Sequence, residues 1–183
     1  SSHLFAPMPK EPAADDLVCA YLLRHAAPQL VDAATAGHAF ARRFFCEAAF
    51  VDLVEDEKHV TALDYLRAFV PDGQPTGTAE GPSAWWQLAY ALGDWALRAA
   101  MARGDMRRAI DSWNRLASLH PGGRTHRRML TLDKVLKGEC SVDDLPPPSS
   151  RDALAALLRQ SFEELPALHA AKCRADAAAI AAE

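Results

Sequence analysis

Acidic and histidine side chains gather at one place in this 183-residue sequence, the run Glu-Asp-Glu-Lys-His at residues 55–59. Asp56 and His59 have the i, i+3 spacing with which helical bundles present a carboxylate and an imidazole to a pair of iron ions. Such a centre needs a second pair of this kind and two further inward carboxylates, and the sequence has no second pair. Since charged side chains are also common at helix ends, we expect no metal site and no cofactor.

The sequence also lacks the patterns that mark common nucleophiles and nucleotide sites. It contains no Gly-x-Ser-x-Gly elbow, no Walker loop and no dinucleotide fingerprint. Its histidines cannot be paired with a nucleophile from the sequence alone, and its four cysteines form no CxxC or Cys/His ligand spacing. We therefore expect no catalytic residue, and reduced cysteines as in the cytoplasm. The five histidines considered as partners of a nucleophile are His25, His38, His120, His126 and His169, and the four cysteines are Cys19, Cys46, Cys140 and Cys173.

Arginine is concentrated in residues 103–128, a stretch that includes only two acids, Asp105 and Asp111. Guanidinium groups bind carboxylates and phosphates, so this stretch is a candidate site for an anionic partner. Solvated helix faces also collect arginine, and that alternative stays open. The formal net charge of -4 and the pI near 6.0 argue against a nucleic-acid binder. The candidate residues are Arg107, Arg108, Arg124, Arg127 and Arg128.

A second group of candidates follows the segment 71–82. Two adjacent tryptophans begin the next predicted helix; tryptophan is enriched in binding hot spots, but such a pair also commonly covers a core from two sides. Further along, Asp94 and Arg98 have the i, i+4 spacing of a surface ion pair. In so apolar a helix, two charges on one face must reach water or a partner. The candidate partner-binding residues are Trp85, Trp86, Tyr90, Asp94, Arg98 and Met101.

Hydrophobic periodicity places most of these side chains on helices. Half of the residues are apolar, alanine and leucine dominate them, and β-branched residues are few, which favours helix over strand. We predict an all-α fold of seven or eight helices, arranged as a helical bundle or as a short array of helical hairpins. The predicted helices span residues 15–25, 28–54, 60–69, 83–103, 105–119, 124–137, 151–165 and 166–182.

Proline and glycine define the predicted domain organisation. Residues 1–14 are expected to be a flexible N-terminal segment, and residues 15–183 a single all-α domain. Residues 71–82 hold three prolines and three glycines and mark either a subdomain break or a long surface loop. Residues 145–150 form a proline-stiffened spacer. No apolar run reaches the roughly 18 to 20 residues needed to cross a bilayer, so no membrane association is expected.

Residues 88–123 carry the features of a helical hairpin. Gly104 falls in the turn, Ala109 takes a small position early in the second helix, and Trp113 takes an aromatic position. Pro121 closes the segment. In these features the segment resembles a tetratricopeptide repeat, a 34-residue pair of antiparallel helices.

The first helix of the hairpin departs from the repeat pattern, because the expected tryptophan position falls on Gly93. The windows 34 residues upstream and downstream also carry no second copy, although a repeat needs neighbours to bury its apolar face. The resemblance implies that the first helix lines a concave groove. Asp94, Arg98 and Met101 would then face a bound partner.

These observations favour a non-catalytic protein–protein interaction or regulatory module that binds a peptide or a partner helix. A homo-oligomer is possible. The alternative is an enzyme or small-ligand binder with an inter-helical pocket around Trp85, Trp86 and Tyr90, and a lesser alternative is an anionic or nucleic-acid partner on the arginine stretch. An open apolar groove would favour the first, and a closed pocket with converging polar groups the second.

Overall fold

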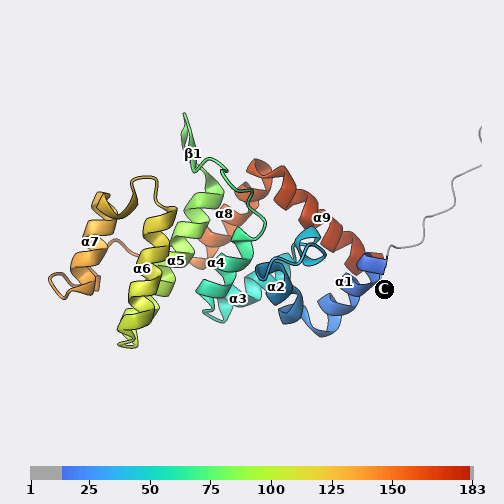
Figure 1. Cartoon of the computed structure of the whole chain (residues 1–183), viewed down its shortest axis with the longest axis horizontal. Coiled ribbons are helices and arrows are strands. Elements are labelled where there is room, and N and C mark those ends of the chain that lie inside the picture. Colours follow the sequence, from blue (N-terminus) through green and yellow to red (C-terminus); the bar gives the residue numbers. More distant parts are fainter. Residues whose placement is uncertain (1–13, 182–183) are drawn as a thin grey trace, which may run out of the picture.

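The computed structural model describes residues 14–181, and within them it is all-α, as predicted. The flexible segment expected at residues 1–14 lies outside the described residues, except for Ala14, which begins the first helix. The helices form an elongated row, with α7 at one end and α1 at the other (Figure 1). The elements are α1 (Ala14–His25), α2 (Ala27–Thr35), η2 (Ala41–Arg43), α3 (Glu47–Glu55), α4 (His59–Arg67), β1 (Gly77–Thr78), β2 (Gly81–Pro82), α5 (Ala84–Ala102), α6 (Met106–Leu119), η3 (Gly123–Thr125), α7 (Arg127–Leu136), η4 (Val142–Asp144), α8 (Arg151–Glu164) and α9 (Pro166–Ala181).

The expected count of seven or eight helices is wrong, since residues 14–181 contain nine α-helices. The difference arises mainly in the long helix expected at 28–54, which is divided into α2, η2 and α3. Gly37 has a φ of +91°, in the left-handed region that ends a helix. Phe44 and Cys46 are then extended, which separates η2 from α3.

The backbone of the segment between η2 and α3 forms hydrogen bonds with parts of the chain that are distant in the sequence. The N–H of Phe45 donates to the carbonyl of Ala171 on α9 at 3.1 Å. The N–H of Cys46 donates to the hydroxyl of Tyr65 on α4 at 2.9 Å. Burial raises the pKa of this phenol, which stays neutral and able to hydrogen-bond. These contacts fix an irregular segment inside the protein.

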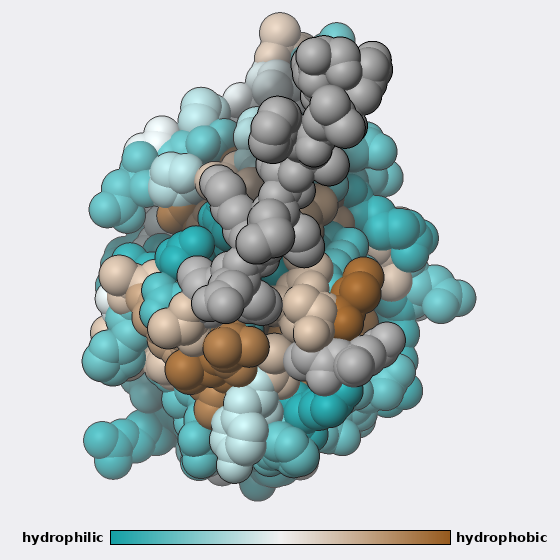
Figure 2. Space-filling model, turned by 90° about the vertical axis from the view of Figure 1, so that its right-hand side faces the viewer, coloured by the Kyte–Doolittle hydropathy of each residue, from teal (hydrophilic) through white to brown (hydrophobic). Residues whose placement is uncertain are grey.

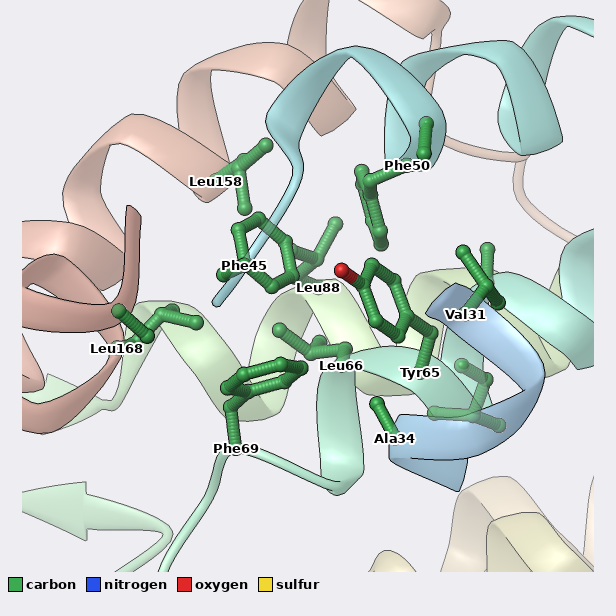
Figure 3. Close-up of a cluster of buried hydrophobic side chains, with 14 of the residues drawn as sticks. Val31, Ala34, Phe45, Phe50, Tyr65, Leu66, Phe69, Leu88, Leu158 and Leu168 are labelled. Atoms are coloured by element: carbon green, nitrogen blue, oxygen red, sulfur yellow. The ribbon is translucent and has the colours of Figure 1, made fainter. Parts of the chain in front are cut away.

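The large core is centred on the ring of Phe45, which is fully buried. This ring stacks on Tyr65 at 5.1 Å between centroids and meets the edge of Phe69 at 5.1 Å (Figure 3). Phe50 and Phe162 lie 5.9 Å away. Aromatic pairs at these separations stabilise a core beyond their buried area. The large core joins α1–α4, α8, α9 and the first half of α5.

The small core lies between the second half of α5, α6 and α7. Leu116 of α6 packs into the space left by Gly93 of α5, where a Cβ would lie 2.6 Å from its Cδ2 atom. This close approach explains why a glycine is tolerated inside a helix, despite its cost of about 1 kcal/mol. The residues of the small core are Leu97, Ala100, Ala109, Leu116, Ala117, Met129 and Leu132.

Helix α5 belongs to both cores and is held at its first residue by a side chain from α8. Ser83 does not cap the helix with its side chain. Instead, both carboxylate oxygens of Glu164 accept from the N–H of Ala84, at 2.9 and 2.8 Å. A carboxylate at this end also matches the positive end of the helix dipole. The helix that carries all six predicted partner-binding residues is therefore anchored to the large core.

The end of the molecule formed by α1 and α9 exposes apolar patches within a mainly hydrophilic surface (Figure 2). The exposed apolar side chains in this part of the chain are Leu17, Val18 and Tyr21 of α1 and Ile180 of α9. Among residues 14–181, no helix is long and apolar enough to span a membrane.

Candidate binding cleft

The candidate functional site is a cleft of about 530 Å³ between α5, α7, the spacer at 145–149 and the start of α8. It brings together side chains that the sequence places on two separate helices. On α5 these residues follow one another at i, i+4 spacing and therefore share one face. The predicted site residues that line the cleft are Trp86, Tyr90, Asp94, Arg98, Arg127 and Arg128.

One wall of the cleft is the spacer, which two side chains of α5 fix in place. The indole N–H of Trp95 donates to the carbonyl of Ser149 at 2.7 Å. The guanidinium Nη2 of Arg98 donates to the carbonyl of Pro146 at 2.6 Å. Because prolines have no N–H, this wall offers a ligand mainly apolar ring surface.

Asp94 and Arg98 form an ion pair at the base of this wall, with 3.1 Å between Oδ2 and Nε. Their side chains are only 15% and 17% exposed, so the pair is not an ordinary solvated pair on a helix surface. Burial raises the pKa of Asp94, although the positive charge of Arg98 opposes the rise. The carboxylate thus keeps Arg98 in position to bind the spacer.

Two further positive charges that line the cleft, Arg127 and Arg128, come from the first turn of α7. The guanidinium of Arg128 lies over the ring of Tyr90, 5.2 Å from its centroid, in cation–π geometry. Burial raises the pKa of Tyr90, and the charge of Arg128 limits that rise. Neither Arg127 nor Arg128 forms an ion pair with a described carboxylate. The cleft therefore has two uncompensated positive charges beside an aromatic surface.

The floor of the cleft is held in place by Trp86. This side chain is 6% exposed, and its indole N–H donates to the carbonyl of Leu119 on α6 at 2.7 Å. Its ring lies 5.3 Å from Tyr90 and 5.5 Å from His120. Trp86 therefore covers the core and lines the cleft at once, so the two interpretations of this residue are compatible.

The other predicted partner-binding residues lie outside the cleft. Trp85 is buried and donates its indole N–H to the carbonyl of Pro75, in the 71–82 segment, at 3.1 Å. Met101 packs against the small core. Neither side chain is part of the surface that contains Tyr90 and Arg98.

The arginine stretch is divided among several places. Arg124 lies over the ring of Trp113, 5.4 Å from its centroid, and does not line the cleft. At the start of α6, Arg107 is exposed and Arg108 pairs with Asp105 at 3.4 Å. Of the five candidate arginines, only Arg127 and Arg128 of α7 line the cleft together with aromatic residues of α5. They reach it because α7 folds back against α6.

The acidic and histidine cluster does not form a metal site among residues 14–181. His59 is 5% exposed and stacks on Trp95, with 5.3 Å between centroids, and its Nδ1 has no hydrogen-bond partner. Burial lowers its pKa. His59 also lines a second hollow of about 360 Å³, whose basic side chains, including Arg103, are accompanied by the acids Glu57 and Asp111. Neither of these two acids forms an ion pair with a described residue, whereas Asp94, the acid that lines the cleft, is paired with Arg98.

Sequence reasoning missed the residues that complete the cleft. Thr131 and Leu132 come from α7, Leu145 and Pro147 from the spacer, and Leu157 from α8. The prolines at 146–148 signalled a stiff extended segment, but nothing in the local sequence signalled that α5 would bind its carbonyls.

No family model, no curated protein and no solved structure matches this chain. The resemblance of residues 88–123 to a tetratricopeptide repeat therefore stays a prediction. Helices α5 and α6 are neighbours, joined by the turn at Gly104, whose φ is +72°. This hairpin geometry is common to many helical proteins, so the assignment of a function rests on the cleft.

Proposed function

We propose that this protein is a non-catalytic recognition module that binds an acidic peptide segment of a partner protein in the cleft. The observation that carries the proposal is the pair Arg127 and Arg128, which form no ion pair with a carboxylate among residues 14–181 and line the same cleft as Tyr90, with Arg128 lying over its ring. A glutamate, aspartate or phosphorylated side chain would receive charge-assisted hydrogen bonds there. The desolvation of Arg128 on binding costs less, because Tyr90 already shields one face of its guanidinium from water.

The apolar lining favours a peptide over an isolated ion. Leu132 and Leu157 lie on two helices and Leu145 and Pro147 on the spacer, all lining the same cleft as the arginines. A peptide with an apolar residue next to an acidic one would fill both parts, with apolar burial providing affinity and the charge providing orientation. The fixed spacer and the buried Trp86 reduce the entropy lost on binding, because they are ordered beforehand.

The chemistry of the lining also favours binding over catalysis. Asp94 is the acidic residue that lines the cleft, and its carboxylate is already engaged by Arg98. A general base must be free to accept a proton from a substrate at hydrogen-bond distance. The polar groups here hold the wall in place instead.

A small anionic ligand is the second candidate, because the volume of about 530 Å³ falls within the range of small-molecule sites. A cytoplasmic location fits either candidate. All four cysteines, at positions 19, 46, 140 and 173, are free, as expected in a reducing compartment.

The test is a selection of displayed random dodecapeptides on the full chain. Three proteins are compared: wild type, R127E/R128E, and the matched control R103E/R107E, which makes the same change of charge outside the cleft. We expect wild type and control to enrich peptides in which an apolar residue neighbours Asp or Glu. We expect R127E/R128E to bind these peptides at least about tenfold more weakly.

Peptides that lack acidic residues, or that bind R127E/R128E as well as wild type, would contradict the proposal. Failure to enrich any peptide above background would also contradict it. A small-ligand site would be indicated if inorganic phosphate alone protected wild type, but not R127E/R128E, against thermal unfolding.

A further inference from the structure

Two imidazoles stack on each other in the turn between α6 and α7. The rings of His120 and His126 lie 3.8 Å apart between centroids and are inclined by 29°. Gly122 makes this contact possible, because a Cβ at that position would lie 2.9 Å from the Cβ of His126. The turn is thus built around the histidine pair.

Both rings use Nδ1 to accept a backbone N–H. His120 accepts from Gly122 at 3.1 Å, and His126 accepts from Arg128 at 3.2 Å. The second bond caps the N-terminus of α7. An Nδ1 that accepts cannot carry a proton, so both rings are neutral in this conformation, with the proton on Nε2.

The surroundings of the pair oppose positive charge. Three arginines lie close to His126 in the sequence, namely Arg124 in η3 and Arg127 and Arg128 in α7. On the other side, α5 presents the rings of Trp86 and Tyr90 to His120, at 5.5 and 6.0 Å between centroids. Neither imidazole forms an ion pair with a carboxylate within residues 14–181. Burial, His126 and Arg128 together lower the pKa of His120. His126 stands at the N-terminus of α7, where the positive end of the helix dipole lies.

We propose that His120 and His126 form an acid-sensitive latch, which closes the α6–α7 turn when both rings are neutral and opens it when they are protonated. A proton on Nδ1 removes the acceptor of a backbone N–H, so each protonation breaks one of the two bonds. Two protonated rings would also place like charges side by side next to Arg128. The N-terminus of α7 then loses its cap, and Arg128 loses its fixed position over Tyr90.

The consequence for the cleft rests on the proposed function. Extra positive charge alone would tighten the binding of an anion in acid. Opening the latch has the opposite effect, since it displaces the arginines that bind the anion. The sign of the pH dependence therefore distinguishes a latch from simple charge accumulation.

The test follows the ring signals of the histidines and the backbone amide signals of Gly122 and Arg128 by NMR on the ligand-free full chain. The pH is lowered from about 8 to about 5, the range in which histidine titrates. We expect the ring of His120 to titrate below the ordinary histidine pKa of about 6.5, and the two amide signals to shift over the same range of pH. A His120 ring that titrates at or above that pKa, or amide signals that do not shift, would overturn the latch.

A variant pair separates the latch from the stability of the turn. Asparagine is a good helix cap that does not titrate, so His126→Asn should keep α7 capped. We expect its Arg128 amide signal to become independent of pH and the midpoint of His120 to rise toward the ordinary histidine pKa, because His126 is one cause of its lowering. The control His38→Asn should change neither, and a His126→Asn protein with an unchanged transition would overturn the latch.

Binding of hexaglutamate then tests the consequence separately. In wild type it should weaken from about pH 7.5 to about pH 5.5, although most glutamates remain ionised. In His126→Asn it should not weaken. Tighter binding by wild type in acid would overturn the latch's effect on the cleft. If neither hexaglutamate nor a peptide enriched in the selection binds at either pH while the NMR transition occurs, the proposed function fails and the latch stands.

Discussion

The large core and the small core differ in how they are built and in what they expose. The large core surrounds the aromatic ring of Phe45 on several sides and joins helices from both ends of the chain. The small core has seven buried residues between α5, α6 and α7, and none of them is an aromatic residue. Its helices have fewer neighbours to cover them, so they present arginines to solvent. The comparison indicates that the large core supports the fold, while the helices of the small core carry Arg127 and Arg128 of the proposed recognition surface.

The largest effect should come from removing the centre of the large core. Phe45→Ala should reduce the free energy of unfolding by about 3–5 kcal/mol, because it leaves a cavity in contact with four aromatic rings. Denaturant titration measures the loss. The control Phe45→Leu should reduce the free energy of unfolding by less than Phe45→Ala, because leucine fills part of the cavity. A loss below about 1 kcal/mol for Phe45→Ala would show that this ring does not support the fold.

A smaller loss is expected at the junction of α5 and α6. Gly93→Ala should cost about 1–3 kcal/mol, since the new Cβ meets Leu116. Combining it with Leu116→Val, which removes the Cδ2 contact, should cost less than the sum of the two single changes. Additive costs in this double-mutant cycle would mean that the two helices do not approach each other as described.

Hydrogen exchange can separate the two cores in the same variants. Gly93→Ala should increase exchange mainly in α6 and α7, while the amides of α4 around Tyr65 stay protected. Uniform loss of protection would show that the two cores unfold as one unit, which would remove the distinction between them.

The fold could be predicted well where local signals are clear. Ser150 caps α8 through the N–H of Ala153 at 3.1 Å, and Gly104 separates α5 from α6, so these boundaries were placed within a few residues. The predicted helix at 28–54 failed because the segment near Phe45 depends on Ala171, which lies far away in the sequence. Local periodicity cannot distinguish a buried extended segment from a helix when its backbone partner comes from another part of the chain.

The cleft was predictable in the same partial way. Tyr90 and Arg98 share a helix face, and that face could be derived from spacing. The contact between Tyr90 and Arg128 depends on the direction in which α7 folds back. The position of the spacer wall depends on the hydrogen bond from Arg98 to the carbonyl of Pro146. Neither leaves a local signal, since a guanidinium can bind any carbonyl that the fold brings to it.

A moderate effect should follow from losing one indole hydrogen bond that joins α5 to α6 within the large core. Trp86→Phe leaves the buried carbonyl of Leu119 without its partner and should cost about 1–3 kcal/mol. Trp85→Phe is a matched control, because its acceptor, the carbonyl of Pro75, is in a segment that water can reach. Thermal unfolding compares the two variants, and an equal or larger loss for Trp85→Phe would contradict the role given to Trp86.

The smallest effect concerns acid. The pKa values of His59 on α4 and of His120, in the turn after α6, are lowered in the folded protein, so the unfolded chain binds more protons below about pH 6.5. The free energy of unfolding should therefore not change above that pH and should decrease as the pH falls below it. Because solvent screens partly exposed groups, we expect the decrease to stay under about 1 kcal/mol. His59→Phe, which can keep the ring against Trp95, should reduce this dependence. An unchanged acid limb in thermal unfolding would assign the loss to other groups.

The most direct test of the central claim is to map hexaglutamate binding by the backbone amide signals of the full chain. We predict that the largest shifts fall around Tyr90, Thr131 and Leu132, that R127E/R128E abolishes them, and that R103E/R107E leaves them in place. Shifts centred on residues 103–108, or shifts that persist in R127E/R128E, would contradict the assignment of the cleft as the recognition site.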